Sequence, residues 1–240
     1  MLASVIFQDV DHFELPVWFS LTAHFAFGVT GALAGLRRGY DVIGVFFLAM
    51  ITGGGGGLIR DGLLISQGPP TILTDERLLV VILLAALLTL FFYRYVDRLG
   101  RALAIVDALG LGAFAVHGVE RSMEAGLSLP AVVVGGTLTA VGGGLLCDIL
   151  VREEPLLFKP GQFYGLVAVG GCGLFLALLH WNPTSPRNAA MITIALVFAV
   201  RMLAIQFNWR TTALYHEPRP VAQPQVESPP APPPVRRDTS

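Results

Sequence analysis

Two glycine runs, each followed by an aspartate, are the stretches of this sequence whose residue types and spacing could do chemistry. The first reads GGGGGLIRD at residues 53–61, and the second reads GGGLLCD at residues 142–148. Five consecutive glycines give up about 4 to 5 kcal/mol of helix preference relative to alanine. In lipid, backbone that leaves the helical conformation survives only where protein or water satisfies its polar groups. The runs therefore predict two broken helices that face a pathway inside the protein.

The residues predicted to form the breaks and to line this pathway come from both runs: Gly53, Gly54, Gly55, Gly56, Gly57, Gly142, Gly143 and Gly144. Close packing of helices through small residues is the alternative interpretation. It accounts for some of the glycines, but it does not explain a duplicated run that an acid follows at a fixed spacing.

Charged residues follow both runs. Arg60 and Asp61 come after the first, and Asp148 comes after the second. An ionisable residue inside a membrane is costly unless it is paired or wetted. We therefore expect these three, together with Arg201 in the last apolar segment, to be pore-end or gating charges. Arg60 could instead extend to the lipid headgroups, and Arg201 is expected to form a salt bridge within the bundle, to Asp148 or Asp107.

The remaining polar residues of the apolar segments do not form a catalytic pattern. Four of them are interpreted as hydrogen-bonding groups between helices: His24, Asp107, His117 and Glu120. No Ser/His/Asp, paired-carboxylate or metal-ligand spacing is present, so we predict neither an enzyme nor a metal or cofactor site. A phosphate-binding loop is excluded because leucines follow Gly62 where its lysine and serine or threonine would stand.

The composition is that of a membrane protein. Hydrophobic residues make up 54% of the chain, charged residues make up 14%, and the mean hydropathy is +0.66. These values lie outside the range of ordinary soluble domains. The net charge of -1 and the absence of a long basic block argue against nucleic acid as a partner.

Seven segments are apolar and long enough to cross about 30 Å of hydrocarbon as helices. They span roughly residues 16–36, 40–66, 78–96, 102–121, 127–151, 162–180 and 188–208. We therefore expect an all-α membrane protein with seven transmembrane helices, of which the second and the fifth carry the glycine runs.

An internal duplication relates the two halves of the chain. A shift of 87 positions (142 minus 55) places residues 55–57 on residues 142–144, Phe27 on Phe114 and Gly31 on Gly118. Each copy holds three spans, an odd number, so the second copy enters the membrane from the opposite side. The prediction is an inverted repeat of residues 16–96 and 101–180, followed by a seventh helix at 188–210. Such repeats commonly surround a pathway near the membrane midplane.

The distribution of Lys and Arg predicts the orientation. Most of these residues lie in loops on one side, among them Arg37, Arg38, Arg94 and Arg152. The positive-inside rule therefore places the amino terminus outside and the carboxyl terminus in the cytoplasm of a cell inner membrane. Residues 1–15 lack the basic start of a cleaved signal peptide, so we expect a retained external segment. Residues 216–240 are Pro-rich and polar, which predicts a disordered cytoplasmic tail.

The residues around both runs resemble a known family. Residues 25–64, which begin FAFGVTG, and residues 107–150, which begin DALGLGAF, are similar to the two halves of glycine-rich bacterial and archaeal homologues of the trimeric intracellular cation channels. The motif is GGGxxRD with a proline several residues on, and Pro69 and Pro155 fill the proline position. The likeness covers roughly residues 16–210. Cys147 departs from it, because the second copy of the motif usually has arginine there.

The resemblance implies a homotrimer with a hydrophilic pore in each subunit, bordered by the second and fifth helices. It implies conduction of monovalent cations, chiefly K⁺ with some Na⁺, in a membrane whose lipids contact the protein. The same family has carried the label of glycine or amino-acid transporter. A potassium-permeable channel is the leading hypothesis, and a small-solute transporter that uses the same repeat interface is the alternative.

Overall fold

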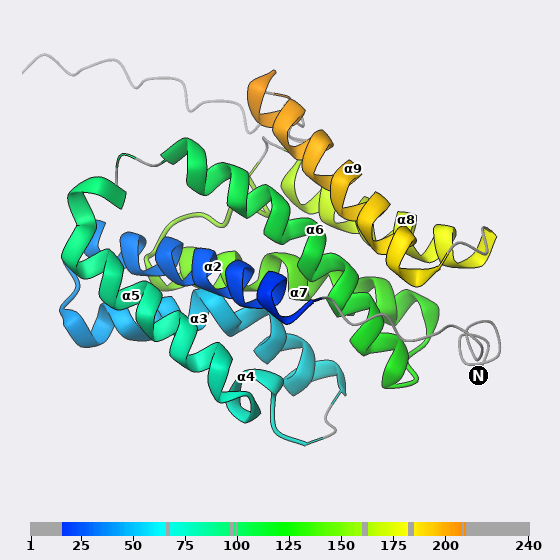
Figure 1. Cartoon of the computed structure of the whole chain (residues 1–240), viewed down its shortest axis with the longest axis horizontal. Coiled ribbons are helices and arrows are strands. Elements are labelled where there is room, and N and C mark those ends of the chain that lie inside the picture. Colours follow the sequence, from blue (N-terminus) through cyan, green and yellow to red (C-terminus); the bar gives the residue numbers. More distant parts are fainter. Residues whose placement is uncertain are drawn as a thin grey trace, which may run out of the picture.

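The protein is a bundle of helices that run back and forth along one axis (Figure 1). The computed structural model describes residues 16–65, 68–96, 98, 100–159, 163–181, 185–207 and 209. In chain order the elements are α2 (Val17–Arg37), α3 (Val42–Ile59), the π-helix η1 (Arg60–Ile65), α4 (Thr71–Thr74), α5 (Glu76–Val96), α6 (Gly100–Glu124), α7 (Leu129–Leu150), α8 (Tyr164–Trp181) and α9 (Pro186–Gln206). The predicted external segment, residues 1–15, and the predicted tail, residues 216–240, lie outside the described residues.

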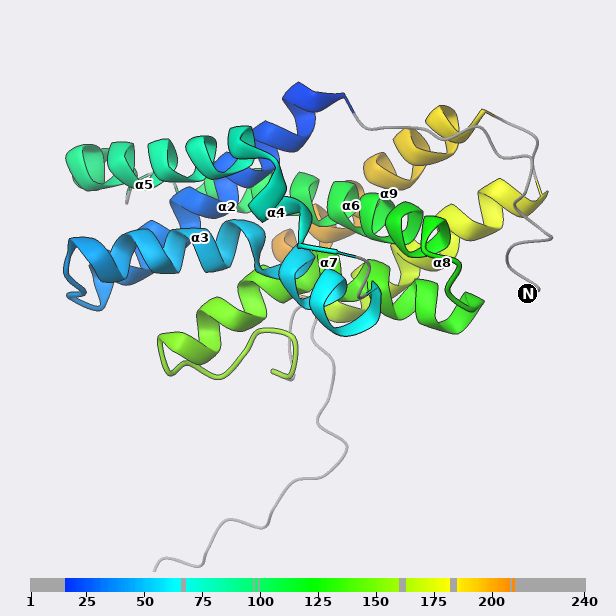
Figure 2. The ribbon, with the colours of Figure 1, turned by 90° about the horizontal axis from the view of Figure 1, so that it is seen from below.

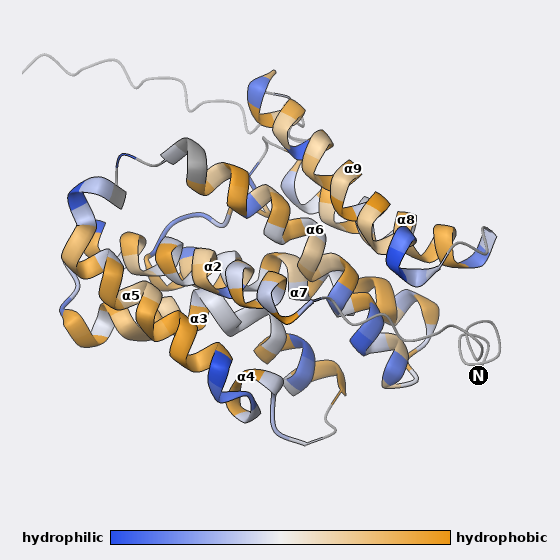
Figure 3. Ribbon diagram, in the orientation of Figure 1, coloured by the Kyte–Doolittle hydropathy of each residue, from blue (hydrophilic) through white to orange (hydrophobic). Residues whose placement is uncertain are grey.

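The predicted seven spans are confirmed. Within the described residues, seven helical segments are long and apolar enough to cross a membrane, and α3 with η1 forms the second of them, Val42–Ile65. The described residues contain helices and no strands. Hydrophobic residues extend along most of each long helix, and hydrophilic ones gather near the helix ends (Figure 3). This distribution is that of a multi-pass membrane protein.

The two halves pack in the same way. Helix α2 contacts α3 and α5, and α6 contacts α7 and α8 in the same pattern, while α9 covers α6 and α8. The first two helices of each half are joined by equivalent turns, because Gly39 and Gly126 lie 87 residues apart (126 minus 39) and both have a φ of 73°. This left-handed conformation favours glycine. The end of the bundle at which α2 begins is called the Val17 end below, and the opposite end the Arg37 end (Figure 2).

The halves meet where α3 crosses α7. A Cβ atom at Gly56 would lie closer than 3.0 Å to the backbone of Thr139, and one at Gly143 would lie equally close to the backbone of Thr52. Each threonine hydroxyl donates to the carbonyl four residues before it in its own helix, Thr52 at 2.6 Å and Thr139 at 2.7 Å. Thr52 and Thr139 are themselves 87 residues apart, so the crossing has the symmetry of the repeat.

The predicted break within the glycine runs is not observed. Helix α3 remains α-helical through residues 53–57, and α7 remains α-helical through residues 142–144. The departure from α-helical geometry comes after the first run, in the π-helix that begins at Arg60. The physical reason is that the glycines at the crossing, Gly55, Gly56, Gly142 and Gly143, allow the two backbones to approach each other. This packing outweighs the poor intrinsic helix preference of glycine.

The crossing predicts which glycines tolerate alanine. Gly56→Ala and Gly143→Ala force backbone apart, and overpacking of this kind costs about 1–3 kcal/mol. Gly57→Ala and Gly144→Ala are the matched controls, because the nearest atom to a Cβ at either position lies at 3.9 Å. Thermal unfolding in detergent should show lower midpoints for the first pair only. Equal midpoints in all four variants would mean that the crossing is not close-packed.

Candidate functional site

A cavity of about 350 Å³ enters the bundle from the Val17 end. Its walls come from α2, α3, α6 and α7 and from Arg60 at the start of η1, and α4, Asp75 and the start of α5 close one side. It begins at Val17, which is exposed, and it ends at the α3–α7 crossing, where Thr52, Gly56, Thr139 and Gly143 form its floor. The cavity therefore reaches the part of the molecule where the two repeats meet.

The predicted glycines divide between the cavity and the crossing. Five of them line the cavity: Gly53, Gly54, Gly56, Gly57 and Gly143. Gly55 and Gly142 pack against the opposite helix of the crossing, and Gly144 lies toward the Arg37 end beside the Tyr164 hydroxyl. The first run thus contributes most of the glycine lining, which the symmetry of the sequence did not predict.

Arg60 and Asp61 form a buried ion pair in the cavity wall. The Arg60 side chain is 1% exposed, and its Nη2 and Nε both lie 2.7 Å from Asp61 Oδ1. Its Nη1 also lies 3.4 Å from the Thr139 hydroxyl, so the guanidinium bridges the two repeats. Arg60 therefore does not extend to the headgroups.

Asp61 ties the π-helix to α4. Its Oδ2 accepts hydrogen bonds from the Thr71 backbone N–H at 3.0 Å and from the Thr71 hydroxyl at 3.2 Å. With the arginine on its other oxygen, this buried carboxylate is fully engaged. Such a network makes the charge tolerable in a membrane-spanning segment. It also fixes the wall of the cavity beside Gly57.

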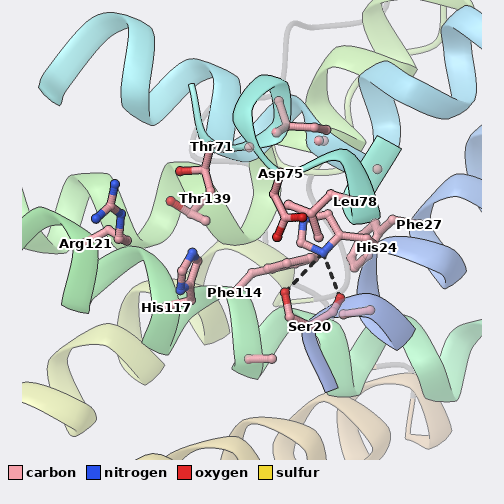
Figure 4. A pocket seen from close by; sticks show the side chains of 18 of the residues that line it. Ser20, His24, Phe27, Thr71, Asp75, Leu78, Phe114, His117, Arg121 and Thr139 are labelled. Atoms are coloured by element: carbon pink, nitrogen blue, oxygen red, sulfur yellow. Dashed lines mark hydrogen bonds between the residues drawn. The ribbon is translucent and has the colours of Figure 1, made fainter. Parts of the chain in front are cut away.

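Several cavity residues were not predicted as site residues. His24 and His117, interpreted from the sequence as packing groups, both line the cavity, as do Glu120 and Arg121. Figure 4 shows His24, Asp75, His117 and Thr139 gathered there from different elements. His24 Nδ1 lies 2.7 Å from the Ser20 carbonyl, and its ring packs edge-on against Phe114. One feature of the sequence could have identified these four residues as site residues: each is an ionisable residue within an apolar segment.

Asp75 and Arg77 stand at the mouth of the cavity. Arg77 Nε and Nη2 donate to the two Asp75 oxygens, both at 2.9 Å. These hydrogen bonds lower the pKa of Asp75 below its usual value. The carboxylate therefore carries its charge at neutral pH.

Asp148 and Arg201 do not join the Arg60–Asp61 pair. Asp148 Oδ2 accepts from the Leu156 backbone N–H at 2.9 Å, at the Arg37 end. Arg201 is buried and lies over the Tyr164 ring, 4.7 Å from its centroid. Among the described residues, Arg201 forms no ion pair with Asp148 or Asp107, so the expected salt bridge is absent. Tyr164 stands between, with its hydroxyl 3.5 Å from Asp107 Oδ1.

The described part of the chain contains no group of three His, Cys, Asp or Glu residues that could hold a metal ion. The polar groups of the cavity are instead hydroxyls, imidazoles and charges that are mostly paired. Such a wall can hold water and solvated ions, but it presents no arrangement for covalent chemistry.

Comparison with known proteins gave one family and several relatives. The family model described as glycine transporter matches residues 17–94 and 104–180, which are the two repeats. A UPF0126 membrane protein of Deinococcus radiodurans is 38% identical over 168 residues, 69% of this chain and 78% of that one. The UPF0126 membrane protein YvgT of Bacillus subtilis is 31% identical over 185 residues, 77% of this chain and 89% of that one.

Solved structures show the same fold. One, from work on the structural basis for conductance through TRIC cation channels, has a TM-score of 0.79 and 32% identity, and the alignment covers 85% of this chain and 100% of that one. A second, the TRIC trimeric intracellular cation channel orthologue from Rhodobacter sphaeroides, has a TM-score of 0.73 and 30% identity, with 80% and 98% covered.

The buried ion pair makes a prediction about stability. Asp61→Asn leaves the Arg60 guanidinium buried without its counter-charge, and it should lower the free energy of unfolding by about 3 kcal/mol, the lower end for such a pair because the cavity admits water. Asp75→Asn is the matched control, since it breaks a pair whose arginine side chain is 61% exposed, and it should change stability little. Chemical denaturation in detergent measures both. Similar losses in the two variants would contradict a special role for the Arg60–Asp61 pair.

Proposed function

This chain belongs to the family that the glycine transporter model describes, and from that premise we propose that it is a cation channel. The resemblance to homologues of the trimeric intracellular cation channels, noted in the glycine-rich repeats, is confirmed by the likeness to their structures. That likeness also agrees with the prediction that the chain is not an enzyme.

The observation that carries the proposal is the cavity. It reaches from the Val17 end to the α3–α7 crossing, and its floor is built from the glycines and threonines that relate the two repeats. A pathway that approaches the midplane along an inverted-repeat interface is the arrangement that membrane transport proteins use. We propose that each subunit has its own pore and that α3 and α7 line it.

The pairing of the charges is compatible with cations as the permeating ions. Arg60 is neutralised by Asp61 in the wall, and Arg77 is neutralised at the mouth by the ionised carboxylate of Asp75, so neither arginine opposes the entry of a cation. The floor offers threonine hydroxyls rather than a ring of bare carbonyls, because the glycine carbonyls belong to continuous helices. Such groups replace only part of an ion's hydration. We therefore propose a preference for monovalent K⁺ that leaves Na⁺ partly permeant.

The structure corresponds to a closed state under this proposal. Beyond the floor, on the side of the Arg37 end, Leu48, Cys147 and Val151 form a buried apolar cluster between α3 and α7. Conduction requires water to pass this point, so the two helices must separate or shift. The π-helix after the first glycine run is a local irregularity of the kind found at functional sites.

We also propose a homotrimer, contacts with membrane lipids, and a place in the cell inner membrane. The Arg37 end would face the cytoplasm, because the loops there carry most of the basic residues. The exposed apolar faces of α5 and α9 are available for lipid or for neighbouring subunits.

Single-channel recording of the purified protein in planar bilayers under a KCl gradient tests the proposal. We expect discrete current steps with a reversal potential near that of potassium. Gly57→Leu should reduce the unitary conductance, because Gly57 lines the cavity and has room for a side chain. Gly170→Leu is the matched control, because a Cβ at that exposed position of α8 meets no atom within 4 Å. Equal currents in both variants would place the pore elsewhere.

The second candidate function is transport of a small solute such as glycine, which the description of the matching family favours. A carrier would show saturable uptake and counterflow of radiolabelled glycine in proteoliposomes, without current steps. Silence in bilayers together with glycine counterflow, from protein shown to be folded, would replace the channel proposal with this one.

A further inference from the structure

The half of the bundle toward the Arg37 end contains positions equivalent to those that line the cavity. Ser20, Gly57 and Arg77 line the cavity. Their equivalents at a shift of 87 are Asp107, Gly144 and Tyr164 (107 minus 20, 144 minus 57, 164 minus 77). A pathway that follows the symmetry of the repeat would therefore continue between these three residues.

This second space is filled by a side chain. The Tyr164 hydroxyl lies 3.9 Å from the position of a Cβ at Gly144, and 3.5 Å from Asp107 Oδ1. The Tyr164 hydroxyl therefore contacts Asp107 and lies over the space where a side chain at residue 144 would begin, the two residues that its repeat equivalent would face across an open cavity. Tyr164 is 6% exposed. At the equivalent position, Arg77 points out to Asp75 with 61% of its side chain exposed, and the cavity beside it is open.

Arg201 holds the tyrosine in place. Its guanidinium stacks over the ring, 4.7 Å from the centroid, and comes from α9, which has no counterpart in the repeat. Its Nε and Nη1 are buried and find no hydrogen-bond partner among the described residues. Unmade hydrogen bonds of a buried cation are expensive. Two donors of the Arg201 guanidinium therefore lack hydrogen bonds, and water could supply these bonds if Tyr164 moved away.

We infer that Tyr164 is the gate of the pathway at the Arg37 end, that Arg201 and Asp107 keep it closed, and that its departure opens a cation-binding space beside Asp107 and Gly144. This inference rests on the proposed channel function. Opening exchanges the Tyr164 hydrogen bond and ring stack for solvation of Asp107 and Arg201. A monovalent cation, still partly hydrated, is the ligand that a buried carboxylate beside a glycine surface would hold.

The first test is electrical. Tyr164→Phe keeps the ring and removes the hydroxyl, so it should raise the open probability about two- to tenfold, the range expected for the loss of one hydrogen bond. Tyr93→Phe makes the same chemical change at an exposed position of α5 and should leave the open probability unchanged. If the protein conducts and Tyr164→Phe does not change the open probability, Tyr164 is not the gate, and the channel proposal still stands.

The second test does not require conduction. In a chain carrying Cys147→Ser and Cys172→Ser, Gly57→Cys and Gly144→Cys are compared for their reaction with a charged thiol reagent in nanodiscs. A Cβ atom fits at both positions, because its nearest neighbour lies at 3.9 Å in each case. Gly57→Cys should react readily, and Gly144→Cys slowly. Adding Tyr164→Ala should accelerate the reaction at Gly144→Cys at least about tenfold, a change of the size expected when buried packing is removed, and should leave Gly57→Cys unchanged.

Arg201→Lys tests the positioning role of the guanidinium. Lysine keeps the charge but loses the planar stack, so Gly144→Cys should react faster in this background too. Size-exclusion profiles that match the parent protein establish that each variant is folded. If Tyr164→Ala does not change the rate at Gly144→Cys, Tyr164 does not occlude this space, whether or not the protein conducts. If no current is seen but Tyr164→Ala accelerates the thiol reaction at Gly144→Cys, the channel proposal is refuted, and Tyr164 is still the residue that closes this space.

Discussion

The structure depends on one contact, the approach of α3 to α7 without intervening side chains. Gly56 meets the Thr139 backbone, and Gly143 meets the Thr52 backbone. In lipid no hydrophobic effect drives helices together, so van der Waals contact at small residues provides much of the association. This contact sets the floor of the cavity and brings Arg60 within reach of Thr139. It also explains why the glycines are tolerated within continuous helices: alanine at Gly56 or Gly143 would gain helix preference and lose the crossing.

The two halves use the same backbone plan with different charges. Arg60 is paired with Asp61 on one side of the crossing, whereas the equivalent of Arg60 is Cys147, which is buried with Leu48 and Val151. A buried arginine is supplied to the second half from outside the repeat, by Arg201 of α9. The seventh helix therefore does more than cover the bundle. It supplies a buried charge that the second repeat lacks at residue 147, and it places that charge against a tyrosine instead of a carboxylate.

The sequence predicted the broad architecture and only part of the site. Seven spans and the internal repeat followed from hydropathy and from the 87-residue shift, because both are carried by local composition. The glycine break was predicted from intrinsic propensity, and tertiary packing overrode it. Thr52 and Thr139 obeyed the same shift, but a hydroxyl within a helix carries no signal until its neighbour is known. The positions of His24, His117 and Arg201 depend on contacts between distant helices, which a single sequence does not specify.

The unequal filling of the two halves bears on the choice between a channel and a carrier. An inverted repeat with one cavity open and the other closed is also the expected form of a carrier caught facing one side. In a carrier the two cavities must be coupled, so that the cavity at one end closes as the cavity at the other end opens. The proposed gate, Tyr164, lies on α8, and α8 packs on α6, α7 and α9. The equivalent residue in the first repeat, Arg77, lies on α5, and α5 packs on α2 and α3. Arg77 is also paired with Asp75 at the mouth, in a geometry that does not depend on α8. Because the two side chains lie on helices with different packing neighbours, the channel proposal expects Tyr164 to leave without driving Arg77 inward. Under that proposal both cavities are open together once α3 and α7 also shift at the apolar cluster of Leu48, Cys147 and Val151, and simultaneous opening is the condition that defines a channel.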